Sequence, residues 1–103
     1  MGRKLDNDKN RLDLVIPSFI IGLGEVLTYG AKKYKSNNWQ TLNDPVNRYY
    51  GAATRHLLAW RNGEAKDPES GIHHLLHAAC NLMFLLWFEN RKEETDEQKS
   101  ELL

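Results

Sequence analysis

Apolar residues recur at the spacing of an α-helix in three long segments of this 103-residue chain. Residues three or four positions apart lie on one face of a helix, so this spacing gathers apolar side chains into a stripe. We expect helices over about residues 17–34, 45–62 and 68–90. Residues 11–16 alternate only partly and could form a short extended segment. The pattern therefore predicts an all-α fold of three main helices.

A proline stands at the expected start of each helix. Pro17 suits a first helical turn, because its ring fixes φ near the helical value and its missing N–H needs no partner there. The Asp-Pro pairs at residues 44–45 and 67–68 repeat this signal, with Asp as the N-cap. Gly63 is expected to end the second helix. Three glycines of the first helix would let another helix or a ligand approach its bare backbone: Gly22, Gly24 and Gly30.

The length and the distribution of charge predict a single domain covering residues 1–103. Residues 1–10 are polar and are expected to be loosely held. Residues 91–103 are charged and could form a solvated helical extension or a frayed tail. The third helix is apolar nearly all round from Leu75 to Phe88, so we expect it to be central or to lie in an oligomer interface.

The balanced charge of the chain argues against one class of partner, the nucleic acid polymers. It has 14 basic and 14 acidic residues, and a binder of nucleic acid polymers would need a basic excess. Its longest apolar run, residues 82–88, is far too short to span a bilayer, and the first residues do not form a secretory signal. The single cysteine, Cys80, reads as a small buried apolar residue and fits a reducing compartment. We expect a cytoplasmic protein.

Polar side chains gather within the expected third helix, which is otherwise apolar. At about 100° per residue, they fall on one broad face over about three turns. The set is Glu69, His73, His74, His77 and Asn81. Imidazole nitrogens and carboxylate oxygens are ordinary ligands of transition metals, while oxygen-rich sets suit magnesium or manganese. The cluster therefore indicates a metal or ligand site, although the histidines could also be core residues that hydrogen-bond to neighbours.

Two charged residues of the first helix are further candidates. Glu25 is the only acid between Pro17 and Tyr34, and it either faces solvent or completes a site with the third helix. Lys33 follows two turns later, where it could meet a phosphate or simply remain solvated. Each of the two residues is thus either part of a ligand site or an ordinary solvent-exposed side chain.

The loop after the first helix and the middle of the second helix supply the remaining candidates. Asn38 and Trp39 could recognise a nucleobase through hydrogen bonds and stacking, or Trp39 could be a plug over the helix ends. Arg55 could bind phosphate through two hydrogen bonds or be an ordinary exposed helix residue. His56, near the edge of the buried stripe, could contact the third helix or a ligand.

Several short motifs occur in a fixed order between about Arg11 and Glu89. They are Tyr29-Gly-Ala-Lys-Lys-Tyr34, Asn37-Asn-Trp39, Arg55-His-Leu-Leu-Ala-Trp60, Gly63-Glu64, Asp67-Pro-Glu-Ser-Gly71 and His74-Leu-Leu-His-Ala-Ala-Cys-Asn81. Together they resemble a family of small, mostly phage-encoded proteins labelled dATP/dGTP diphosphohydrolase-like. That family is similar to the all-α nucleoside triphosphate pyrophosphohydrolases of the MazG-like group. The resemblance implies a helix bundle that assembles as dimers or tetramers, working in the host cytoplasm.

The resemblance also implies a reaction, in which a (deoxy)nucleoside triphosphate and water give the monophosphate and pyrophosphate. It implies Mg²⁺ or Mn²⁺, which in the MazG-like group is bound by acids on two facing helices. On that basis the expected metal ligands are Glu25, Glu69, His74, His77 and Asn81, of which Glu25, Glu69 and His77 are the catalytic candidates. The expected nucleotide-binding residues are Lys33, Asn38, Trp39, Arg55 and His56. The alternative is a protein that binds or sequesters a nucleotide without cleaving it.

Overall fold

The computed structural model describes residues 8–102 of the chain, with the side chains of residues 8–92. Within that range the secondary structure is helical, apart from one isolated bridge between Lys66 and His73, which confirms the all-α prediction. The elements are η1 (Leu12–Leu14), α2 (Pro17–Lys33), η2 (Asn38–Thr41), α3 (Pro45–Arg61) and α4 (His74–Leu102). No helix in the described part of the chain is long and apolar enough to cross a membrane.

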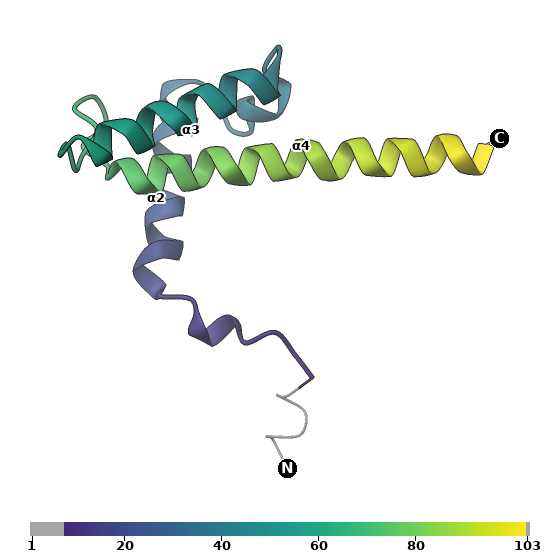
Figure 1. Ribbon diagram of the computed structural model, residues 1–103, viewed down its shortest axis with the longest axis horizontal. Coiled ribbons are helices and arrows are strands. Elements are labelled where there is room, and N and C mark those ends of the chain that lie inside the picture. Colours follow the sequence, from purple (N-terminus) through teal and green to yellow (C-terminus); the bar gives the residue numbers. More distant parts are fainter. Residues whose placement is uncertain (1–7, 103) are drawn as a thin grey trace.

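Helices α3 and α4 form an antiparallel pair joined by the loop of residues 62–73 (Figure 1). Helix α2 crosses this pair at a steep angle, near the end where the loop lies (Figure 1). The later part of α4 runs on beyond α3 as a single helix. The charged C-terminal segment is thus a helical extension through Leu102, one of the two forms expected for it.

Most helix ends agree with the sequence pattern. Helix α2 begins at Pro17, and α3 begins at Pro45 after Asp44. Asp44 stands at the N-cap position as expected, but it is left-handed (φ 51°) and its side chain makes no capping hydrogen bond, so the expected capping role is not confirmed. Helix α3 ends at Arg61, and the following Gly63 has a φ of 101°, the left-handed conformation that glycine adopts most easily. A 3₁₀ turn replaces the extended segment considered for residues 11–16. Of the N-terminal segment expected to be loosely held, residues 1–7 lie outside the described residues.

The expected start of the third helix at residues 67–68 is wrong, because α4 begins at His74. The Asp67 carboxylate accepts a hydrogen bond from the backbone N–H of Ser70 (2.9 Å), as an N-cap would. The turn that it opens ends at once, because Gly71 has a φ of 74° and its N–H bonds to the Asp67 carbonyl (2.8 Å). The Asp-Pro signal thus starts a single turn of the loop, and Glu69 belongs to that loop.

The buried core is small and lies where the three helices meet. Its apolar members are Val26, Tyr49, Ala53, Ala78 and Cys80. Burial raises the pKa of the Cys80 thiol to about 11, so the thiol stays protonated, as expected of a small buried residue. Several large apolar side chains of α2 and α4 remain exposed, among them Ile20, Ile21, Leu82 and Leu86. Oligomerisation stays a prediction.

Aromatic side chains hold η2 against α4. The ring of Trp39 stacks on Phe84 with centroids 4.5 Å apart and meets Trp87 and Phe88 edge-on at 5.1 and 6.4 Å. The Tyr49 hydroxyl donates a hydrogen bond to the Trp39 carbonyl (2.8 Å), which joins α3 to the same cluster. This is the arrangement of a plug over the helices, the second of the two interpretations of Trp39.

Gly22 of α2 lies directly against the side chain of Leu76 in α4, which would have to move if Gly22 carried a side chain. A Cβ at this position would lie 2.5 Å from Cδ1 of Leu76, whereas a Cβ at Gly24 would meet nothing within 4 Å. We expect Gly22→Val to lower the free energy of unfolding by about 1–3 kcal/mol through overpacking. The matched control Gly24→Val should leave it within about 0.5 kcal/mol of wild type, since valine is a slightly better helix former than glycine. Urea unfolding followed by circular dichroism measures both, and equal effects would contradict the close contact.

Candidate functional site

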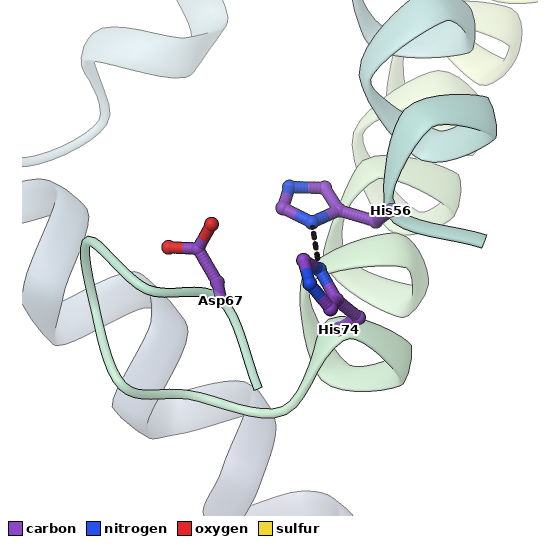
Figure 2. A group of neighbouring side chains, drawn as sticks. All are labelled: His56, Asp67 and His74. Carbon is purple, nitrogen blue, oxygen red and sulfur yellow. Dashed lines mark hydrogen bonds between the residues drawn. The ribbon is translucent and has the colours of Figure 1, made fainter. Parts of the chain in front are cut away.

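Three side chains with metal-ligand chemistry converge where α3, α4 and the connecting loop meet. His56 comes from α3, Asp67 from the loop and His74 from the first turn of α4 (Figure 2). One ligand atom from each lies within 4.8 Å of the other two. It is the only such group of three or more among the side chains that the structure describes. The site therefore exists only because α3 packs against α4 and the connecting loop folds back onto both helices.

His74 is the buried centre of this cluster, with 4% of its surface exposed. Its Nε2 lies 2.6 Å from Oε1 of Glu64, and its Nδ1 lies 2.8 Å from Nδ1 of His56. A carboxylate can only accept, so Nε2 of His74 carries the proton that is donated to Glu64. In the neutral imidazole Nδ1 of His74 then holds the lone pair, and His56 donates to it.

The His77 ring stacks on the His56 ring. The two rings stack with centroids 4.6 Å apart and planes only 7° from parallel. The Nε2 of His77 lies 2.7 Å from Oγ of Ser70, whose oxygen also accepts from the N–H of Ile72 (3.1 Å). The Asn81 side chain donates to the backbone carbonyl of His77 (3.0 Å), which leaves its amide tied to its own helix. His77 thus fixes the orientation of the His56 ring.

The surroundings favour uncharged imidazoles beside a charged carboxylate. Burial lowers the pKa of His56, and the neighbouring His77 and His74 lower it further. Burial also lowers the pKa of His77, although the charge of Asp67 opposes this. Burial acts to raise the pKa of Asp67, but hydrogen bonds from Ser70 and the nearby imidazoles outweigh it, so that this pKa is lowered. At neutral pH His56 and His77 are therefore uncharged and Asp67 is an anion, which are the forms of these groups that bind metal.

Glu69 lies at the edge of the cluster and connects the loop to α2. Its carboxylate accepts a hydrogen bond from the Tyr29 hydroxyl (3.0 Å) and forms an ion pair with Lys33. Hydrogen bonds from Lys33 and Tyr29 lower the pKa of Glu69, and the same contact raises the pKa of Lys33. Two residues predicted for different roles, metal binding and phosphate binding, thus neutralise each other in this structure.

The other predicted residues, all within the described part of the chain, make no hydrogen bond, ion pair or ring contact with the imidazoles. Glu25 is exposed on α2, and Arg55, next to His56 in the chain, is exposed on α3 and acts on that imidazole only through its charge. Asn38 and Trp39 lie in η2, whose tryptophan packs further along α4, near Phe84. Of the predicted nucleotide-binding residues, only His56 joins the histidines of α4.

Glu64 and Ser70 contact histidines, and the Asp67 carboxylate lies within 4.8 Å of His56 and His74, yet the spacing along a single helix selects none of the three. The sequence pattern indicates a helix cap at Asp67 and places Ser70 inside the expected helix. Gly71, four residues after Asp67, is the signal that could have found them. A glycine at that distance is typical of a tight turn, and polar side chains in such a turn can contact the neighbouring helices.

Comparison with known proteins agrees with the resemblance drawn from the sequence motifs. Residues 1–98 match the family model described as dATP/dGTP diphosphohydrolase, N-terminal. A protein of Salmonella phage PMBT28 named dATP/dGTP diphosphohydrolase is 37% identical over 98 residues, which cover 95% of this chain and 33% of that protein. The chain thus spans about a third of the length of this relative. No solved structure matches the chain. On the extent of these matches, the chain belongs to the dATP/dGTP diphosphohydrolase N-terminal family.

Proposed function

We propose that this chain takes part in the hydrolysis of dATP or dGTP to the deoxynucleoside monophosphate and pyrophosphate. The observation that carries the proposal is the convergence of His56, Asp67 and His74, in a chain of this family, at one end of the α3–α4 pair. A related phage protein bears the name of this activity, although the present chain corresponds to only a third of it. A bound metal would polarise a phosphate and activate water there.

The pair of Lys33 and Glu69 supports a place for the phosphates beside the cluster. Glu69 lies two residues after Asp67 in the same loop, and its charge acts on both Asp67 and His77. An incoming triphosphate carries more negative charge than a carboxylate and would compete with Glu69 for Lys33. In this proposal Lys33 moves to the phosphates, and Glu69 is released to act as a ligand for the Mg²⁺ or Mn²⁺ that accompanies the nucleotide. Glu25, exposed on α2, is the second candidate carboxylate for that ion.

Incubation of the purified chain with dATP or dGTP and Mg²⁺ or Mn²⁺ tests the proposal. We expect equal amounts of monophosphate and pyrophosphate, measured by chromatography with mass spectrometry. Glu69→Gln should abolish turnover, whereas Glu89→Gln, which changes an exposed carboxylate of α4, should leave it unchanged. A folded, metal-supplied chain that leaves both nucleotides intact would contradict the proposal.

Nucleotide binding without cleavage is the second candidate. It is favoured by the chemistry of the cluster and the adjoining His77, because three imidazoles there face few carboxylates and Glu69 is already paired with Lys33. This function predicts that dATP or dGTP is recovered intact from a stoichiometric complex. Glu69→Gln would then change no turnover, because there is none to lose, and Lys33→Ala would weaken binding.

A further inference from the structure

We propose that His56, Asp67 and His74 form a binding site for one divalent transition-metal ion of the Zn²⁺ and Co²⁺ class. The inference deepens the proposed function, because it concerns the same site, and it names a metal class and a ligand set. It starts from the cluster of three ligand atoms within 4.8 Å, contributed by α3, the loop and α4 (Figure 2). The imidazole nitrogens and the carboxylate oxygen are the donors that such ions prefer.

Glu64 prepares His74 for this role. Metal-bound histidines usually donate their second ring N–H to a carboxylate or carbonyl, which fixes the tautomer and the ring orientation. Here Nε2 of His74 is 2.6 Å from Oε1 of Glu64, and the ring is 4% exposed. The lone pair of Nδ1 is therefore directed at His56, at the place where the second imidazole nitrogen lies.

The distance between the two imidazoles suits a shared cation. Their Nδ1 atoms lie 2.8 Å apart and share one proton. Two nitrogens that bind one tetrahedral zinc ion at about 2.0–2.1 Å are about 3.3 Å apart, so the rings need to separate by only about half an ångström. The cation would take the place of the shared proton, which moves to Nε2 of His56 through solvent, and the imidazole remains neutral.

Neighbouring residues hold the other two ligands in place. Asp67 accepts a hydrogen bond from the N–H of Ser70 at its Oδ2 (2.9 Å), which fixes the carboxylate beside the rings. His77 stacks on His56 and is itself bonded to Ser70, so it acts as a positioning residue. Ser70 therefore links the Asp67 carboxylate to the His77 ring, which orients His56. Each of the three proposed ligands is thus held by a neighbouring residue.

The donor set also predicts selectivity. Magnesium requires near-octahedral oxygen coordination and loses its waters reluctantly, so two imidazoles and one carboxylate suit it poorly. Three protein ligands leave the fourth tetrahedral position open, which is the arrangement of catalytic rather than structural zinc sites. A phosphate oxygen or a water molecule could occupy that position.

Direct binding measurements on the full chain, stripped with chelator and without nucleotide, test the site. We expect one equivalent of Zn²⁺ by calorimetry and elemental analysis, and a tetrahedral absorption spectrum with Co²⁺. Millimolar Mg²⁺ should not displace either ion. His56→Ala and Asp67→Asn should each weaken Zn²⁺ binding by about 100-fold or more, and Glu64→Gln by about 10–100-fold, the range for residues behind a ligand.

His73→Ala is the matched control. This histidine adjoins His74 but bonds to the N–H of Leu75 (3.0 Å), so its loss should leave the affinity unchanged. Circular dichroism shows whether each variant is folded, and Asp67→Asn keeps the shape of the side chain. The site is overturned if His56→Ala and Asp67→Asn, both folded, bind Zn²⁺ as tightly as wild type.

The metal site and the proposed function can fail separately. Tight, selective Zn²⁺ binding by a chain that cleaves no nucleotide supports the site and contradicts the hydrolase. Cleavage by a chain that binds no transition metal overturns the site and leaves the hydrolase in place.

Discussion

Replacement of Trp39 by alanine is expected to lower the free energy of unfolding by about 2–4 kcal/mol. The ring contacts Phe84, Trp87 and Phe88 of α4, and its removal leaves a cavity that these large side chains cannot easily fill. Full burial of a Phe or Trp would give about 3–5 kcal/mol, and the partial exposure of Trp39 reduces this range. Urea unfolding followed by circular dichroism measures the change.

Tyr50→Ala is the control for this experiment, because Tyr50 is an aromatic residue of α3 that is 66% exposed. Its loss should change stability by less than about 0.5 kcal/mol. If Trp39→Ala unfolds like wild type but binds dATP or dGTP less well, Trp39 stacks on the base instead of packing against α4. Equal stability losses in the two variants would also contradict the packing role.

His74→Ala is expected to lower the free energy of unfolding by about 2–4 kcal/mol in the presence of EDTA. The substitution leaves a cavity at a site that is 4% exposed, and it removes the partner of both Glu64 and His56. The half-buried His56 then keeps a ring nitrogen that water cannot fully solvate, which costs about 1–3 kcal/mol in addition to the lost packing. EDTA ensures that the measurement reports the protein contacts alone.

His73→Ala provides the comparison within the same pair of histidines. It removes only a hydrogen bond to the first turn of α4, so we expect a loss below about 1 kcal/mol. Stability curves for the two variants should therefore separate clearly. If they coincide, His74 does not have the central position that its contacts indicate.

The fold was largely predictable because helical periodicity and helix-end chemistry are local properties. Pro17, Pro45 and Gly63 take the positions that their backbone preferences require. The start of α4 was not predictable, because the same Asp-Pro signal can open a single turn as well as a long helix. Gly71 and the hydrogen bonds that the loop makes where it turns back determine that a single turn forms here.

The site was predictable only in the part that lies on one helix. Spacing selected His74 and His77, because residues three apart on a helix are neighbours whatever the rest of the chain does. Their partners come from other elements, so the pairing of His56 with His74 depends on how α3 packs against α4. Glu69 was expected on the same face, but the loop conformation directs it to Lys33 on α2.

The connection between α3 and α4 is shorter than the stretch of chain between α2 and α4, and this difference bears on the order of folding. His56, Asp67 and His74 all belong to this hairpin of adjacent helices, whose contacts close only a short loop. Such contacts are expected to form early, since closing this loop costs less entropy than pairing with α2, which is more distant in the sequence. We therefore expect the three proposed metal ligands to come together before α2 docks, so that a bound cation would stabilise the hairpin while the chain is still folding.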